Sequence, residues 1–236
     1  MNYEAEAYKL KESGVVVLSD LLTREQIEYW RKRITREIAA GPEFAADLSA
    51  ETLGAAQGGS FGAFGTPSAF HCNAVRELRR YLHTKLRFFF SQLGLLYQFE
   101  KIELLLDRFR LQPIGTSSSS ETWHRDQPAP SPVSDQVLQG YLNFSEPSGI
   151  QKFRCIPGTQ LISASGFIKA KPSATQIASA ITLTINPGDM VFFDPTIIHS
   201  VYALRKIKTA LTRLHLGIRL SNSDKAPLPR LLDNSL

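Results

Sequence analysis

The chain has 236 residues, of which 43% are hydrophobic and 21% are charged, a balance typical of a globular domain with enough apolar material for a core. The net charge is +5, from 27 basic and 22 acidic residues spread along the chain. This excess is compatible with an anionic ligand but makes nucleic acid an unlikely main partner. Two cysteines, Cys72 and Cys155, exclude a disulfide framework and a cysteine-based zinc site.

No apolar run of the sequence is long enough to cross a membrane. The polar start MNYEAEAYKLKESG lacks the hydrophobic segment of a signal peptide. We therefore expect a cytoplasmic protein without a membrane partner. The length favours a single domain over residues 1–236.

The first hundred residues predict a helical support. Residues 15–18 form a short apolar run, and Thr23 and Gln26 have the spacing of a capping box that opens a helix. Gly41-Pro42 ends that helix. Its apolar positions recur every three or four residues, at Ile27, Trp30, Ile34 and Ile38.

A second helix is predicted over residues 74–93, after a glycine-rich stretch. The stretch, residues 54–68, lacks the spacing of a phosphate-binding loop, and we interpret it as a surface loop. The apolar side of the second helix carries Val75, Leu78, Leu82, Leu86 and Phe89.

After Lys101 the sequence changes to short β-type runs separated by Gly, Pro and Ser, with no helix expected between them. Such a pattern predicts a barrel or sandwich. We expect residues 14–100 to be mainly helical support, 101–221 to form the β core, and 222–236 to be a tail. The predicted fold class is mainly β with N-terminal helices.

The segment Trp123-His124-Arg125-Asp126 carries the most informative motif. His-x-Asp alone is weak evidence, because it arises by chance in a chain of this composition. A kinase catalytic loop would need Asn where Ser131 stands. In an extended segment His124 and Asp126 point to the same side and can bind one metal ion. Two histidines and one carboxylate on one side of the ion form the facial triad of non-haem Fe(II) oxygenases.

The metal interpretation requires a second histidine. His199 follows a strand and a proline turn and is the best candidate, whereas His71 and His83 lie in the helical region.

The last strand, residues 212–221, alternates polar and apolar side chains. One face carries Arg213, His215 and Arg219. Either this face lies in water, or it lines a pocket in which a buried arginine binds a carboxylate.

These segments resemble one known family. WHRD, FRCIPGTQ, NPGDMVFFDPTIIHSV and TRLHLGIRLS, together with the opening SGVVVLSDLLTREQIEYWRKRI, are similar to the phytanoyl-CoA dioxygenase-like branch of Fe(II)/2-oxoglutarate-dependent oxygenases. The resemblance covers most of residues 14–221.

The resemblance implies a double-stranded β-helix, or jelly roll, and an Fe(II) ion held by His124, Asp126 and His199. It implies 2-oxoglutarate and O₂ as co-substrates, succinate and CO₂ as products, and hydroxylation of a small or acyl-type substrate, with an anionic substrate as one option. Because Asp126 is present where related halogenases have a small residue, hydroxylation is favoured over halogenation. The 2-oxoglutarate anchor would be Arg213, with Arg219 as the fallback.

Several departures and secondary candidates accompany the resemblance. Val201 stands where the family often has a small polar residue, and Arg213 lies slightly further along the chain from His199 than the family's arginine usually does. IPGTQ lacks the histidine that ends the family's P-G-S-H turn.

Tyr141 and Asn143 share a strand face and are candidates for co-substrate contact or for a structural role. The remaining candidates are Arg205 as a weaker anchor, Asp194 as a partner of His199, Asp189 as a turn residue, Trp123 as packing beside the site, Arg108 and Arg110 as surface charges, and Ser117–Ser120 as a lid.

Three other functions stay open on the sequence. They are a cupin-like metalloenzyme that does not use 2-oxoglutarate, a catalytically silent jelly-roll binding protein, and a nucleic-acid demethylase of the same chemistry. The sequence specifies neither the substrate nor the oligomeric state.

Overall fold

The computed structural model describes residues 1–40, 73–105, 109–112, 121–127, 135–145, 152–162, 169–202 and 211–222. Several predicted features lie outside these residues: the glycine-rich loop, His71, Arg108, Ser117–Ser120, Ser131, Arg205 and the tail from residue 223. The side chains of Ile38 and Arg110 also lie outside the description.

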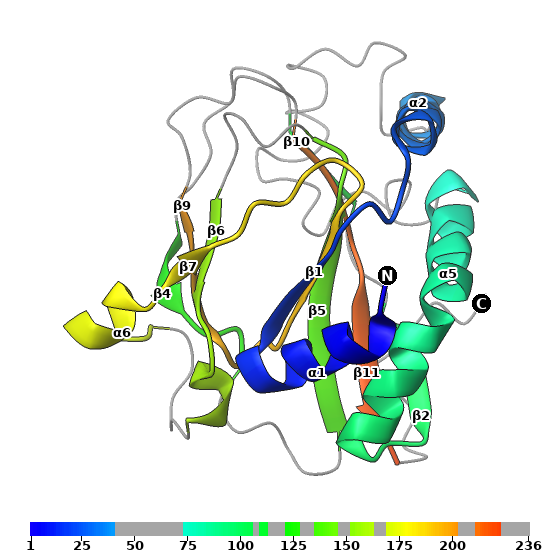
Figure 1. The fold of residues 1–236 in the computed structure, drawn as a ribbon. Helices are drawn as coiled ribbons and strands as arrows, with labels where there is room; N and C mark the ends of the chain where they lie inside the picture. The colour runs from blue at the N-terminus through cyan, green and yellow to red at the C-terminus, as the bar shows by residue number, and fades with distance from the viewer. Residues whose placement is uncertain are drawn as a thin grey trace.

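Three long helices lie on one side of the molecule (Figure 1). They are α1 (Tyr3–Ser13), α2 (Arg24–Ala40) and α5 (Asn73–Tyr97). Both predicted helices are confirmed, although α5 runs four residues beyond its predicted end. The capping box is also present: Thr23 N donates to Gln26 Oε1 at 3.0 Å and Gln26 N to Thr23 Oγ1 at 3.3 Å.

Helix α1 was not predicted, because its apolar residues are few and small or amphipathic and form no clear stripe. Asn2 caps its first turn by accepting from Ala5 N, and its only buried side chains are Ala7 and Leu10. It ends at Gly14, whose φ of 78° is accessible to glycine at little cost.

Two antiparallel sheets make up the β part. The larger sheet has the order β1-β8-β5-β10-β3, and β11 joins β5 to β2. Its strands are β1 (Val15–Leu18), β2 (Lys101–Leu105), β3 (Phe109–Gln112), β5 (Asp135–Asn143), β8 (Met190–Phe193), β10 (Leu211–His215) and β11 (Gly217–Ser221). The smaller sheet has the order β4-β9-β6-β7, with β4 (Glu121–His124), β6 (Lys152–Ile156), β7 (Ile181–Thr182) and β9 (Ile198–Tyr202).

The prediction of a mainly β fold with N-terminal helices is confirmed in the described residues, with one correction. The β-type run AITLTI, residues 180–185, predicts a strand, but the strand is only the exposed pair Ile181–Thr182. A short helix, α6 (Ala174–Ala178), precedes it where no helix is expected. Ser173 and Gln176 form a second capping box at the start of α6. The helix was missed because it is too short to show an apolar period.

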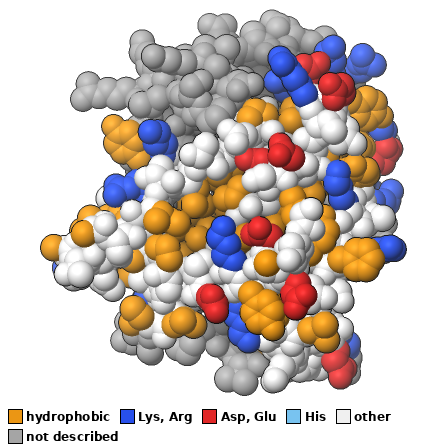
Figure 2. All heavy atoms as spheres, viewed as in Figure 1, with side chains coloured by type: hydrophobic (Ala, Val, Ile, Leu, Met, Phe, Trp, Pro, Cys, Tyr) orange, Lys and Arg blue, Asp and Glu red, His pale blue; other side chains and the backbone are white. Residues whose placement is uncertain are grey.

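Two apolar clusters lie on opposite faces of the larger sheet, and strands β1, β5 and β8 contribute to both. The outer cluster packs the three helices against the larger sheet, and includes Leu214, Leu216, Ile218 and Leu220 from β10 and β11. The inner cluster lies between the sheets, and includes Val15, Tyr141, Phe153, Cys155, Val191 and Phe193. Figure 2 shows hydrophobic side chains gathered over the space between β1 and the β6–β7 pair.

The turn before β8 is built as its sequence NPGD predicts. Gly188 has a φ of 88°, and a Cβ at this position would lie 2.4 Å from Leu22 O. Asp189 accepts from Asn186 N at 2.8 Å and from Asp20 N at 2.9 Å. Asp189 is therefore a turn residue, as predicted.

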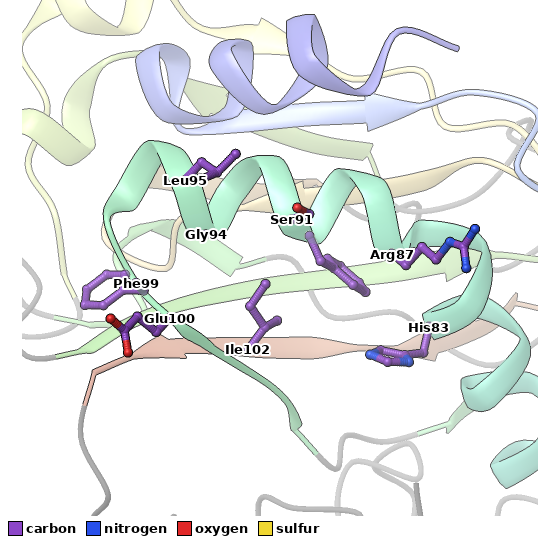
Figure 3. A pocket seen from close by; sticks show the side chains of 9 residues that line it. His83, Arg87, Ser91, Gly94, Leu95, Phe99, Glu100 and Ile102 are labelled. Atoms are coloured by element: carbon purple, nitrogen blue, oxygen red, sulfur yellow. The ribbon is translucent and has the colours of Figure 1, made fainter.

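A pocket of about 340 Å³ lies between α5 and the start of β2 (Figure 3). It is lined by His83, Arg87, Phe90, Ser91, Gly94, Leu95, Phe99, Glu100 and Ile102. It lies on the helical layer, and none of the metal-ligand candidates lines it. Among the described residues, no helix is long and apolar enough to cross a membrane.

Candidate metal centre

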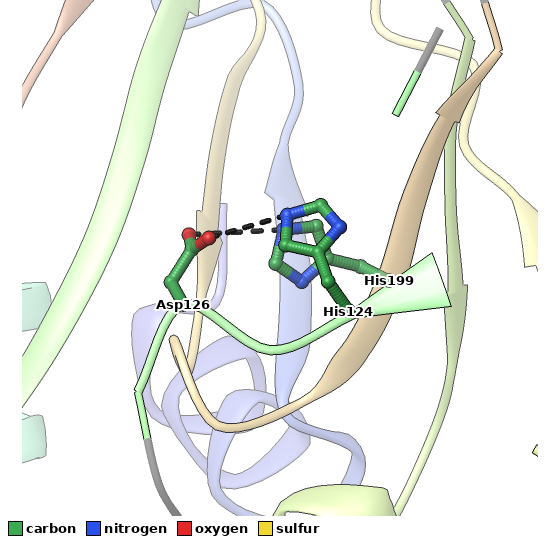
Figure 4. Close-up of side chains that lie close together, drawn as sticks. All are labelled: His124, Asp126 and His199. Carbon is green, nitrogen blue, oxygen red and sulfur yellow. Dashed lines mark ion pairs between the residues drawn. The ribbon is translucent and has the colours of Figure 1, made fainter. Parts of the chain in front are cut away.

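His124, Asp126 and His199 come together between the sheets, as the motif predicts. His124 ends β4, His199 lies on β9, and the two are direct partners in the β4–β9 pairing. One ligand atom from each of the three residues can be chosen so that all lie within 4.8 Å of one another. Figure 4 shows the carboxylate of Asp126 facing both imidazoles.

Both histidines are held in the tautomer that a metal site needs. His124 Nδ1 lies 2.7 Å from Thr122 O, and His199 Nδ1 lies 3.0 Å from Ile197 O. A carbonyl only accepts hydrogen bonds, so each Nδ1 carries the proton. Each Nε2 then presents a lone pair.

These lone pairs point at a carboxylate. His124 Nε2 lies 3.3 Å from Asp126 Oδ1, and His199 Nε2 lies 3.7 Å from Asp126 Oδ2. Three converging acceptors repel one another unless a cation, either a proton or a metal ion, lies among them. Two imidazoles and a carboxylate fit a first-row divalent metal such as iron.

The ring of His199 is fixed by aromatic neighbours of the inner cluster. Phe153 stacks on it with centroids 5.2 Å apart and an interplanar angle of 18°, and Phe193 lies at 5.3 Å. Cys155, the β6 partner of His199, is fully buried beside them. Burial raises the pKa of the Cys155 thiol to about 12. The surroundings of His199 are therefore apolar and buried, whereas His124 is half-buried.

The polar face of the last strands turns inward, so its interpretation as a solvent-facing surface is wrong. Arg213 and Arg219 are both only 8% exposed. The guanidinium of Arg213 lies over the ring of Tyr141, 4.4 Å from its centroid. The ring of His215 lies 5.6 Å from that of Tyr141. Arg213, His215 and Tyr141 thus form a polar cluster on the inner face of the larger sheet.

Arg219 lies on the same face but has a different neighbour. Its Nη1 lies 3.1 Å from Glu103 Oε2, across the β11–β2 pairing. This carboxylate already satisfies part of its charge.

Asn143 has a structural role in the described residues. Its amide nitrogen donates to Ser145 O at 2.7 Å and to Ile185 O at 2.8 Å, and its oxygen accepts from Ser145 N. One amide hydrogen therefore holds the residues directly after β5, and the other holds the end of β5 to the segment after β7.

Two secondary expectations are corrected. Asp194 is not the acceptor for His199 Nδ1; it accepts from Thr196 N at 2.8 Å and Gln136 Nε2 at 3.0 Å. Burial raises the pKa of Asp194, although these hydrogen bonds oppose the shift. The ring of Trp123 lies under the guanidinium of Arg154, 5.0 Å away, and Arg154 pairs with Ser200, so its side chain alternates away from the His199 face.

Sequence reasoning missed the contacts of Arg125 and Gln160. Arg125 is buried and its guanidinium donates to the backbone carbonyls of Thr159 and Thr196. Gln160 occupies the place of the family's histidine in IPGTQ, and its Nε2 donates to Lys11 O and Glu12 O at the end of α1. Only the unusual residue types at these two positions hinted at a special role.

Comparisons by sequence find no matching family model and no matching curated protein. Comparison of structures finds similar folds. The epimerase SnoN from nogalamycin biosynthesis, described as non-haem and α-ketoglutarate-dependent, superposes with a TM-score of 0.62 at 13% identity, over 98% of this chain and 95% of that chain. SnoN has also been solved with Fe³⁺, α-ketoglutarate and nogalamycin RO.

Two further solved structures have comparable similarity. EvdO2 from Micromonospora carbonacea var. aurantiaca, in complex with 2-oxoglutarate, gives a TM-score of 0.60 at 14% identity, over 96% of this chain and 94% of that chain. EctD from S. alaskensis gives 0.61 at 14% identity, over 96% and 79%. At these identities the comparisons establish a shared fold.

Proposed function

We propose that the chain is a non-haem Fe(II)- and 2-oxoglutarate-dependent oxygenase of the phytanoyl-CoA dioxygenase-like branch. In this proposal residues 1–236 form one domain, whose two sheets are the double-stranded β-helix, and the enzyme works in the cytoplasm. The observation that carries the proposal is the convergence of His124, Asp126 and His199, with both Nδ1 atoms bound to carbonyls and both Nε2 atoms facing the carboxylate.

The cofactors follow from the donor set and the interior arginine. His124, Asp126 and His199 would hold Fe(II), and three ligands on one side leave positions for 2-oxoglutarate and O₂. Arg213 would bind the distal carboxylate of 2-oxoglutarate, because a planar guanidinium matches a carboxylate in two hydrogen bonds. Tyr141, which lies against Arg213, would add its hydroxyl to that site. Arg219 is the weaker candidate because of its contact with Glu103.

When bound, the iron and the co-substrate supply the oxidising power that the side chains lack. The chain's own residues do the rest. Phe153 and Phe193 keep the ring of His199 in place and exclude water around it. Thr122 O and Ile197 O hold the Nδ1 protons, so that both histidines remain neutral ligands.

We propose a small or acyl-type organic substrate, either anionic or neutral, and hydroxylation as the reaction. The acidic ligand Asp126 supports hydroxylation over halogenation, since it fills the position that a halide would need. SnoN is described as an epimerase and SnoK, another structural neighbour, as a carbocyclase. The outcome of oxidation therefore has to be measured on the products.

The proposal is tested by anaerobic addition of Fe(II) and then 2-oxoglutarate to the metal-free protein. We expect a weak visible charge-transfer band that appears only when both are present. Asp126→Ala should abolish the band, because one of three ligands is lost. His83→Ala is the matched control, since His83 is an exposed histidine on α5 outside the triad, and it should retain the band.

Two results would contradict the proposal. One is a wild-type protein that gives no band with Fe(II) and 2-oxoglutarate. The other is an Asp126→Ala variant whose band is unchanged. A protein that binds divalent metal tightly but gains no thermal stability from 2-oxoglutarate would instead support a metalloenzyme that does not use this co-substrate.

A further inference from the structure

Arg125 stands between two members of the triad in the sequence, but its side chain binds elsewhere. It is 5% exposed. Its Nη1 donates to Thr159 O at 3.0 Å and to Thr196 O, and its Nη2 lies 3.5 Å from Ile162 O. A buried guanidinium is costly to desolvate. Its contacts with backbone carbonyls therefore call for a functional or structural reason.

The three carbonyls belong to two segments, and each segment adjoins His199: one precedes it in the chain and the other is hydrogen-bonded to the residue before it. Thr196 lies in the turn between β8 and β9, three residues before His199. Thr159 lies in, and Ile162 directly after, the short 3₁₀ helix η1 (Thr159–Leu161), which continues from β6. The hydroxyl of Thr159 accepts from Ile198 N at 2.9 Å, next to His199. Arg125 thus joins the end of β4 to the start of β9.

The same turn is fixed by a second set of hydrogen bonds. Asp194 Oδ1 accepts from Thr196 N at 2.8 Å and from Thr196 Oγ1 at 2.6 Å, and its Oδ2 accepts from Gln136. Asp126 N donates to Pro195 O at 2.8 Å. The turn therefore accepts a hydrogen bond from the backbone N–H of Asp126. It accepts another from the guanidinium of Arg125, the residue before Asp126. A shift of the turn would therefore change the distance between the carboxylate of Asp126 and the imidazole of His199.

We propose that Arg125 is a positioning residue that sets the separation of the ligands on β4 and β9, and through it the metal affinity of the triad. The inference rests on the proposed function, since it presupposes that the triad binds a metal ion. Arg125 touches neither metal nor co-substrate in this proposal; it acts through Thr196 and Thr159. Outer-sphere partners of metal ligands typically change metal affinity by roughly ten- to a hundredfold when removed.

The test compares Arg125→Gln and Arg125→Lys with the wild type. Fe(II) and Co(II) affinities are measured anaerobically on the metal-free proteins, and the visible spectrum of the Co(II) forms reports the coordination geometry. We expect Arg125→Gln to bind both ions roughly ten- to a hundredfold more weakly, with altered Co(II) bands. Arg125→Lys should fall between, because an ammonium keeps the charge but reaches fewer carbonyls.

Arg79→Gln is the matched control. Arg79 is also a fully buried arginine, but it lies on α5 in the helical layer. It should lower the unfolding midpoint and leave the metal affinity and the Co(II) spectrum unchanged. If Arg125→Gln behaves in the same way as Arg79→Gln, Arg125 merely stabilises the fold and the inference is wrong.

The outcomes separate this inference from the proposed function. A wild-type protein that binds neither ion overturns the proposed function and the inference together. A wild-type protein that binds both ions, with Arg125 variants of equal affinity and spectrum, overturns the inference alone. If Arg125→Gln does not fold, Arg125→Lys decides by the same two measurements.

Discussion

The two faces of strands β10 and β11 have opposite surroundings. The outer face, with Leu214, Leu216, Ile218 and Leu220, packs against the helices in the outer cluster. The inner face carries two arginines and a histidine, yet both arginines are buried and His215 is half-buried. The helices cover the first face, and the smaller sheet lies opposite the second (Figure 1).

The comparison distinguishes residues that stabilise the fold, on the outer face, from residues whose burial needs another explanation, on the inner face. Burying leucine stabilises the native state by removing apolar surface from water. Burying Arg213 costs free energy unless an anion or a hydrogen-bond partner offsets it. A chain that needed only stability would do as well with apolar residues on both faces. The polar residues of the inner face therefore call for a role other than stability, and the proposed 2-oxoglutarate site would supply one.

The largest expected effect concerns the exclusion of water from the Cys155 thiol in the inner cluster. With the pKa of this thiol raised to about 12 by burial, its thiolate fraction at pH 8 is on the order of a thousandfold below that of an ordinary thiol with a pKa of ~8.5. We expect alkylation of Cys155 in the native Cys72→Ser variant to be slower by about that factor. The rate is measured by mass spectrometry, with the urea-unfolded protein as reference.

The sign of the pH dependence follows from the same shift. Between ~8.5 and about 12 the unfolded chain loses the Cys155 proton and the folded chain keeps it, so stability should fall as pH rises through this range. A native thiol that reacts as fast as the unfolded one would show that water reaches the inner cluster.

The next effect concerns the outer face. Leu216 is fully buried, and replacing a buried leucine by alanine costs about 2–5 kcal/mol. We expect Leu216→Ala to lower the free energy of unfolding by that amount in urea denaturation, with the metal affinity of the folded protein unchanged. Leu95→Ala is the matched control, because Leu95 lies on α5 but is 70% exposed. Equal losses of unfolding free energy in the two variants would contradict the conclusion that burial of Leu216 in the outer cluster stabilises the fold.

Regular features with a strong period were predictable from the sequence. The apolar stripe of α5 and the alternation in β10–β11 each follow from one periodicity, and the structure places them as expected. Helix α1 lacks such a stripe: it is held by the cap at Asn2 and two buried side chains, which leave little trace in the sequence.

The candidate site was predictable in its members but less so in their surroundings. His124 and Asp126 are close in the sequence, so their shared direction follows from local geometry. Their approach to His199 depends on the β4–β9 pairing, which no local pattern specifies. His199 was the predicted partner because it follows a strand and a proline turn and because the resemblance implies it. The contacts of Arg125, Asp194 and Asn143 depend on turns brought together only by the fold, and no local pattern specifies them.

The smallest expected effect sharpens the comparison within the inner face itself. Arg213 and Arg219 are equally buried, and they have different described neighbours: Arg219 lies 3.1 Å from the carboxylate of Glu103, whereas Arg213 lies over the ring of Tyr141. We expect Arg213→Gln to weaken 2-oxoglutarate binding by about ten- to a hundredfold, as for the loss of a charge-assisted pair of about 1.5–3 kcal/mol. Arg219→Gln should instead leave that affinity nearly unchanged and lower the stability, because it leaves Glu103 without its cation.

Both affinities are measured by titrating 2-oxoglutarate into the anaerobic metal-loaded protein, and both stabilities by urea unfolding. Tyr141→Phe provides an intermediate case, since it keeps the ring under the guanidinium of Arg213 and removes only the hydroxyl. If Arg219→Gln weakens binding more than Arg213→Gln, the anchor lies on β11, and Glu103 must release Arg219 when the co-substrate binds. Arg219 would then exchange the carboxylate of Glu103 for that of 2-oxoglutarate. Glu103 would hold the guanidinium of Arg219 in position until the co-substrate binds.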